Sequence, residues 1–271
     1  MLFMRKILLL IIMCALTSAT VFSQTKIDAA CRSKYAKMYF TDSLGTVLPF
    51  RLLTPEKAEG DTSKYPVVLF LHGAGERGDD NEVQLTYIDT VFAAERFRRE
   101  HPCYVIVPQC GVDYRWCETD WTRTYHTIPK DISKYLHAAN SLLDSIAALP
   151  DADTNRLYVT GMSMGGFGTW DIITRYPGKF AAAMPLCGGA DEKEARKLIN
   201  IPIRTFHGAL DKAVPVCRSR NITNAIRSQG GKMIEYTEYP KFGHFIWNKV
   251  YNDYENLEWL MRQERGMRKE E

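Results

Sequence analysis

The stretch that decides the fold is Arg156-Leu157-Tyr158-Val159-Thr160-Gly161-Met162-Ser163-Met164-Gly165. Residues 156–160 form a short apolar run typical of a buried strand, and a helix-like pattern begins at Met164. Between them stands Gly-x-Ser-x-Gly, whose glycines let the chain turn sharply and pass close to itself. A serine hydroxyl is a poor nucleophile unless the backbone exposes it and a base activates it. The pattern alone is common, but in this strand-to-helix context it predicts that Ser163 is a catalytic nucleophile.

Further apolar runs and helical patterns alternate along the chain. Expected strands lie at residues 35–41 and 46–54, around a turn at 42–45, and at 67–71, 104–107, 156–160, 181–186, 203–206 and 233–239. Expected helices lie at 129–148, where apolar residues are spaced three and four apart, and at 164–176, 216–229 and 254–262. Continuous apolar strands that alternate with helices predict an α/β fold with a mostly parallel sheet covered on both faces.

The N-terminal residues have the composition of an export signal. A positively charged start and an apolar run at residues 7–16 precede small or tolerated residues at 21–23. The apolar run is shorter than the roughly 20 residues that a membrane span needs. We therefore expect residues 1–23 to be a signal peptide and residues 24–271 to be a single catalytic domain. The protein would be exported, to the periplasm or the extracellular space, without stable membrane insertion.

Charge and cysteine content narrow the classes of partner. The chain carries 35 Lys and Arg against 32 Asp and Glu, a balance that gives no electrostatic reason to expect nucleic acid as a partner. Neither Cys-x-x-Cys pairs nor Cys/His spacing indicates a metal. Beyond the expected signal peptide stands an even set of cysteines, which permits disulfides in an exported protein: Cys31, Cys103, Cys110, Cys117, Cys187 and Cys217. Bridges Cys187–Cys217 and Cys110–Cys117 are hypotheses, and free buried thiols are the alternative.

A serine nucleophile needs a base, and the base needs a carboxylate that orients it. His244 follows the last predicted strand and is the strongest candidate for the base. Asp211 follows the strand at 203–206 and is the candidate acid. The competing carboxylate, Asp191, stands at a charged helix start, where an acidic side chain meets the helix dipole favourably. The resulting order of serine, aspartate and histidine is the order found in α/β-hydrolases.

Two further histidines, His72 and His207, each end an apolar strand before a glycine. We interpret both as side chains that pack and form hydrogen bonds near the active edge without catalysing.

An oxyanion hole requires two donors aimed at the carbonyl oxygen. The N–H of Met164, directly after the nucleophile, would supply one. The second is expected from the glycine-rich loop at residues 72–78, and we assign it to the N–H of Ala74, with Gly75 as the alternative. This loop lacks both the Lys-Ser/Thr ending of a P-loop and the glycine spacing of a dinucleotide site, so we expect no cofactor.

The loop at residues 109–129 is dense in aromatic side chains, including Trp116 and Trp121. Aromatic rings can stack on a sugar or a phenolic acyl group, or they can seal the loop as a hydrophobic plug. Trp247, three residues past His244, either lines the cleft or pins the histidine loop. We predict that these three tryptophans bind substrate, and the plug remains the alternative.

Together these motifs resemble the secreted bacterial esterases of the α/β-hydrolase superfamily. The resemblance spans residues 65–259, and its most specific segments are 71–81, 108–110, 161–166, 207–211 and 243–247. The group includes polyhydroxybutyrate depolymerase-like proteins and feruloyl or acetyl-xylan esterases, and it is similar to the catalytic domain of prolyl oligopeptidases. The resemblance implies an α/β-hydrolase fold, a triad of Ser163, Asp211 and His244, and an oxyanion hole formed by Ala74 and Met164.

We therefore expect an exported serine carboxylesterase that forms an acyl-enzyme and uses neither cofactor nor metal. Its substrates would be small-molecule or polysaccharide-linked esters, with feruloyl or acetyl groups on carbohydrates. One alternative is a peptidase of the prolyl oligopeptidase type. The other, from a different class, is a non-catalytic carbohydrate-binding relative, which would keep the aromatic loop but usually lose a triad member.

Overall fold

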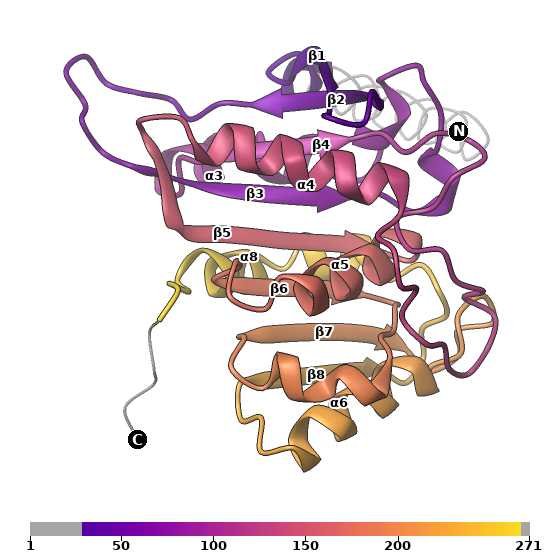
Figure 1. Cartoon of the computed structure of the whole chain (residues 1–271). Helices are drawn as coiled ribbons and strands as arrows, with labels where there is room; N and C mark the ends of the chain where they lie inside the picture. The colour runs from indigo at the N-terminus through magenta and orange to yellow at the C-terminus, as the bar shows by residue number, and fades with distance from the viewer. Residues whose placement is uncertain (1–28, 267–271) are drawn as a thin grey trace, which may run out of the picture.

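The computed structural model describes residues 29–266 of the chain (Figure 1). The expected signal peptide, residues 1–23, lies outside the described residues. Among the helices that are described, none combines the length and apolar character required to cross a membrane.

One eight-stranded sheet carries the structure, with the strand order β1-β2-β4-β3-β5-β6-β7-β8. Strand β2 pairs antiparallel with both β1 and β4, and every other neighbouring pair is parallel. The strands are β1 (Ala36–Thr41), β2 (Val47–Leu53), β3 (Tyr65–Leu71), β4 (Tyr104–Pro108), β5 (Ala152–Met162), β6 (Ala182–Leu186), β7 (Ile203–Gly208) and β8 (Ile234–Tyr239). The carboxyl ends of the parallel strands meet at one edge of the sheet, where such folds bind their ligands.

Helices cover both faces of this sheet (Figure 1). On one face lie α4 (Lys134–Ala147), α5 (Met164–Arg175) and α6 (Cys217–Ser228), and on the other lie α3 (Glu95–Glu100) and α8 (Tyr254–Met261). The remaining helical elements are η1 (Ala74–Glu76), η2 (Val83–Leu85), α2 (Asp89–Phe92), η3 (Glu192–Leu198) and α7 (Trp247–Tyr251). The predicted fold class is confirmed: this is an α/β-hydrolase fold with a mostly parallel sheet between two helical layers.

The central strand β3 explains why its sequence is apolar at every position. Val67, Leu69 and Leu71 pack into one core cluster, together with side chains of α4 and α5. Val68 and Phe70 alternate with them and pack into the cluster on the opposite face. Side chains of a strand point alternately to the two faces, so a strand covered on both sides needs no polar position. Burying each such side chain contributes about 1.5–3 kcal/mol.

Helix boundaries differ from the predictions where side chains cap the helices. The helix expected from residue 129 begins at Lys134, because the Ser133 hydroxyl accepts the N–H of Leu136 at 3.3 Å and so satisfies a free donor of the first turn. Asp191 caps η3 by accepting the N–H of Lys193 at 3.1 Å. That position agrees with its interpretation as a helix-start residue.

The two disulfide hypotheses are wrong. Cys110, Cys117, Cys187 and Cys217 are all thiols, and the first three are buried. Burial raises the pKa of the Cys110 and Cys187 thiols. The Cys187 thiol donates to the backbone oxygen of His244 at 3.4 Å, so it helps to hold the loop that carries this histidine.

Candidate active site

Ser163 stands on a strained turn between β5 and α5. Its φ of 56° lies in the left-handed region, which costs a non-glycine residue on the order of 1–3 kcal/mol. The chain passes so close to β3 here that a Cβ on Gly165 would overlap the carbonyl oxygen of Leu71. The N–H of Ser163 donates to the oxygen of Leu186 at 2.9 Å, which anchors the turn to β6. This geometry leaves the serine half-buried, at the edge where the strands end.

The structure brings Ser163, His244 and Asp211 together from three separate loops. His244 Nε2 lies 2.8 Å from Ser163 Oγ, and His244 Nδ1 lies 2.6 Å from Asp211 Oδ2. The aspartate side chain has no exposure to solvent and the histidine side chain is 13% exposed. With Nδ1 donating to the carboxylate, Nε2 is free to accept a proton from the serine. The arrangement can therefore generate an alkoxide nucleophile.

Asp211 is held as a carboxylate by its hydrogen bonds. Burial opposes ionisation, but donors from His207, His244 and the N–H of Val214 outweigh it and hold the pKa of Asp211 well below its usual range. Its Oδ1 accepts the N–H groups of Ala213 at 2.8 Å and Val214 at 2.9 Å. An anionic, oriented acid favours the imidazolium that forms when His244 takes up a proton.

His207 was expected to pack near the site, and the structure places it directly on the acid. Its Nε2 donates to Asp211 Oδ2 at 3.0 Å and lies 3.1 Å from the oxygen of Val214. Its Nδ1 lies 2.8 Å from the Ser219 hydroxyl, which donates to the oxygen of Gly188 at 3.0 Å. The sequence predicted that His207 forms hydrogen bonds near the site, but it did not identify Asp211 as the partner. The available signal was the four-residue spacing between His207 and Asp211. This spacing alone does not show whether the two side chains form a hydrogen bond or only pack nearby.

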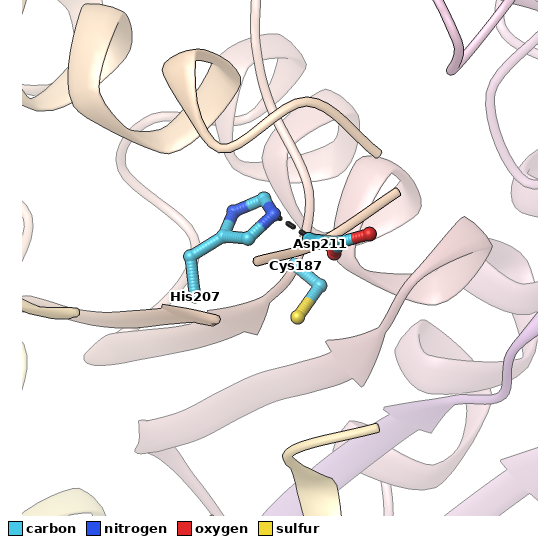
Figure 2. Close-up of side chains that lie close together, drawn as sticks. All are labelled: Cys187, His207 and Asp211. Atoms are coloured by element: carbon cyan, nitrogen blue, oxygen red, sulfur yellow. Dashed lines mark hydrogen bonds and ion pairs between the residues drawn. The ribbon is translucent and has the colours of Figure 1, made fainter. Parts of the chain in front are cut away.

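Figure 2 shows His207 joined to Asp211 by a hydrogen bond, with Cys187 beside the aspartate. The ligating atoms of the three residues lie within 4.8 Å of one another, and all three residue types can bind metals. The Asp211 oxygens, however, already accept four hydrogen bonds, two of them from histidines. A metal would therefore compete with His244 for the carboxylate, so the cluster fits a hydrogen-bonded support for the acid.

The two expected oxyanion donors lie at the starts of helical elements. Ala74 opens η1 and is half-buried, and Met164 opens α5 directly after the serine. Within residues 29–266 neither backbone N–H donates a hydrogen bond to a protein acceptor. Free N–H groups at a helix start are the donors that an oxyanion requires.

The loop that carries Ala74 is fixed by the fully buried His72. Burial lowers the pKa of His72 to about 4, so the ring is neutral near pH 7. Its Nδ1 donates to the oxygen of Gly73 at 2.6 Å and its Nε2 accepts the N–H of Cys110 at 2.9 Å. Arg77 Nε donates to the oxygen of Ala74 at 2.9 Å, which fixes the far end of the turn. Both ends of the loop are thus anchored.

The three predicted substrate-binding tryptophans occupy different environments. Trp116 has no solvent exposure, its indole N–H donates to the oxygen of His72 at 3.0 Å, and it offers no surface to a substrate. It is therefore the hydrophobic plug, and its assignment as a substrate contact is corrected. Trp121 is half-buried over a small cluster that includes Phe167. Trp247 is 5% exposed and its ring stands edge-on to the ring of His244 at 5.4 Å, so it pins the base.

Exposed apolar side chains lie on the loops that carry the acid and the base, and sequence reasoning missed them. Phe245, next to His244, is 75% exposed, Leu210, next to Asp211, is 60% exposed, and Phe242 is 39% exposed. The N–H of Leu210 donates to the oxygen of Phe242 at 2.9 Å, which joins the two loops. The signal was present in the sequence, because large apolar residues flank both catalytic positions in segments expected to be loops.

Comparison with known proteins agrees with the fold. The model of the family described as "Putative esterase" matches residues 41–249, most of the chain. The crystal structure of a thermostable esterase superposes with a TM-score of 0.79 and 37% sequence identity, covering 87% of this chain and 64% of that one.

Two curated relatives are more distant. A protein of Oryza sativa subsp. japonica named as a probable carboxylesterase is 23% identical over 204 residues, which is 67% of this chain and 82% of the relative. An uncharacterized secreted protein of Arthroderma benhamiae is 26% identical over 251 residues, covering 78% of this chain and 25% of the relative. The chain therefore spans less than two thirds of the length of the secreted protein and of the thermostable esterase.

Proposed function

The chain belongs to the esterase family whose model it matches, and we propose that it is a serine carboxylesterase that works through an acyl-enzyme. The observation that carries this proposal is the continuous chain of hydrogen bonds from Ser163 Oγ through His244 to Asp211, at 2.8 and 2.6 Å. Such a chain converts a hydroxyl into a nucleophile without a metal or an organic cofactor.

In the first half of the reaction, His244 Nε2 takes the proton of Ser163 as the serine oxygen attacks the ester carbonyl. The negative charge that develops on the carbonyl oxygen is met by the N–H groups of Met164 and Ala74. Asp211 keeps the imidazole in the required tautomer and stabilises its charged form. The imidazolium then gives its proton to the alcohol oxygen, the carbon–oxygen bond to the alcohol breaks, and the acyl group stays on the serine.

In the second half, water takes the place of the alcohol. His244 removes a proton from the water, whose oxygen attacks the acyl carbonyl. The tetrahedral intermediate collapses, the bond to Ser163 breaks, and the imidazolium returns the proton to the serine oxygen. The acid is released and the free enzyme is restored.

Replacing Ser163 tests this proposal. We expect Ser163→Ala to lower kcat for 4-nitrophenyl acetate by about 10⁴-fold or more and to abolish labelling by a fluorophosphonate. Circular dichroism and thermal unfolding serve as the control for folding, because alanine removes only an oxygen from a half-buried position. Turnover at the wild-type rate in this variant would refute the serine mechanism.

For substrate and location we further propose an exported enzyme that removes feruloyl or acetyl groups from carbohydrates. The family resemblance and the signal-like residues 1–23 support this, as does the secreted relative. Rates on acetylated and feruloylated saccharides, measured beside a proline-containing amide, test the substrate class and separate an esterase from a peptidase. N-terminal sequencing of the processed protein tests cleavage after Ser23.

A further inference from the structure

Three exposed apolar side chains lie on the two adjoining loops that carry Asp211 and His244. We define the aromatic platform as Phe245, Phe242 and Leu210. The loops that carry them touch, through the Leu210–Phe242 backbone hydrogen bond and through the close approach of Gly208 to Gly243. Large apolar groups exposed together at a functional site are unusual on a soluble protein and commonly mark a binding surface.

Neighbouring rings hold Phe245 in place although it is exposed. Its ring centroid lies 4.8 Å from that of Trp247 and 5.8 Å from that of His244, both in edge-to-face orientations. Trp247 is buried and is itself packed against Tyr87, with centroids 5.5 Å apart. Phe242 is similarly packed against Tyr239, at 5.6 Å. A ligand that covers the platform therefore meets a preorganised surface and orders few side chains on binding.

The position of the platform identifies which half of an ester it faces. His244 must donate its proton to the alcohol oxygen, so the alcohol lies within hydrogen-bond reach of Nε2 during acyl transfer. Phe245 is the exposed residue that follows this histidine in the chain and lies against its ring. Of the two halves of an ester, the alcohol is thus the one whose oxygen must reach the histidine that Phe245 contacts.

We propose that the aromatic platform is a leaving-group subsite that stacks on the ring of the alcohol half. The inference rests on the proposed esterase function and deepens it. The three platform side chains consist of hydrocarbon alone, so they match a ligand surface without hydrogen-bonding groups. The carbon–hydrogen face of a pyranose and the face of an aryl alcohol share that chemistry, whereas a short open-chain alcohol is too small to cover a phenyl ring.

Acetyl esters of three alcohols test the subsite, since a common acyl group isolates the alcohol. We would measure kcat/KM, which includes alcohol release, for ethyl acetate, phenyl acetate and an acetylated methyl xyloside. Phe245→Ala is expected to lower kcat/KM about tenfold for the two ring esters and less than twofold for ethyl acetate. Phe245→Leu, which keeps apolar volume but not the flat ring, is expected to lose most of the same activity. Tyr39→Ala, at a 59% exposed aromatic residue on edge strand β1, is the matched control and should change nothing.

The outcomes separate this inference from the proposed function. A tenfold loss on both ring esters supports a shared ring-face subsite, and a loss on one of them assigns the platform to sugars or to aryl alcohols. Equal losses on all three esters, or full activity of Phe245→Leu on the ring esters, would overturn the inference while leaving the esterase intact. If the wild-type protein hydrolyses none of the esters and Ser163 is not labelled, the proposed function fails and the inference fails with it.

Discussion

The loop at residues 109–129 and the loop at residues 240–246 each hold one aromatic side chain in an environment opposite to the other's. The first contains Trp116, which is completely buried and bonded through its indole N–H to the oxygen of His72. The second contains Phe245, which is 75% exposed beside the catalytic base. A tryptophan has an indole N–H that can donate to a backbone carbonyl, so the whole side chain can be buried under a loop. The phenylalanine has none, and the proposed leaving-group subsite gives its exposed face a function.

The number of aromatic residues in a loop therefore does not indicate which of their rings could contact a ligand. The 109–129 loop attracts attention in the sequence because it is rich in aromatic residues, yet its fully buried tryptophan, Trp116, donates a hydrogen bond to the oxygen of His72 at the start of the oxyanion loop. The shorter loop exposes Phe245 next to His244, while the exposed aromatic side chains of the longer loop are Tyr114 and Tyr125. Each region can be tested by removing its central ring, because the first should respond in stability and the second in substrate preference.

The largest expected effect is a loss of stability on removing the buried ring of Trp116. Trp116→Ala should lower the free energy of unfolding by about 3–5 kcal/mol, because it empties a packed site and leaves the carbonyl of His72 without its donor. Phe245→Ala should change it by less than about 0.5 kcal/mol, as expected for an exposed side chain. Urea unfolding of both variants beside the wild type measures the difference. Equal destabilisation of the two variants would contradict the conclusion that Trp116 stabilises the fold and Phe245 does not.

The strands and the grouping of Ser163, Asp211 and His244 were predictable because they depend on local patterns and on the order of the strands. Buried strands such as β3 are apolar at every position, and the elbow around Ser163 requires glycine at fixed positions. Asp211 and His244 follow from the order of strands, since parallel strands deliver their following loops to one edge. These features need no knowledge of which segments touch.

Burial and pairing were not predictable because they depend on contacts between distant segments. Trp116 bonds to a residue 44 positions away, and Asp191 accepts the N–H of Ile128 from the aromatic loop at 3.0 Å. Whether two cysteines form a disulfide or remain thiols likewise depends on the distance between the loops that follow the strands. Composition shows that a loop is aromatic, but only the tertiary contacts decide which ring is covered.

Acid should lower the free energy of unfolding, because it forces a proton onto the fully buried His72. Its pKa of about 4 lies below the ordinary value near 6.5, so the unfolded chain binds this proton first. Stability is therefore fully present above pH 6.5 and is lost as the pH falls towards 4, by about 3 kcal/mol from this group. His72→Gln should remove that part of the pH dependence. Urea unfolding at pH 7.5 and 4.5 gives the slope for both proteins, and identical slopes would contradict the assignment.

The smallest expected effect concerns catalysis and comes from His207, which supports Asp211 through a hydrogen bond. Its hydrogen bond to Asp211 Oδ2 helps to keep that carboxylate anionic and aimed at His244. His207→Leu removes the donor and should lower kcat about tenfold, or about 1.4 kcal/mol of transition-state stabilisation, with KM changed less than twofold. His207→Gln retains an N–H donor and should recover most of the rate.

The ratio between these two variants carries the test, since both replace a buried histidine and both disturb packing. A hydrogen bond that positions the acid acts on proton transfer, so it changes kcat and leaves substrate binding on the aromatic platform intact. A residue that only fills space would be replaced equally well by leucine and by glutamine. Equal rates in the two variants would therefore reduce His207 to a packing residue, and the support of Asp211 would rest on its backbone donors and on His244 alone.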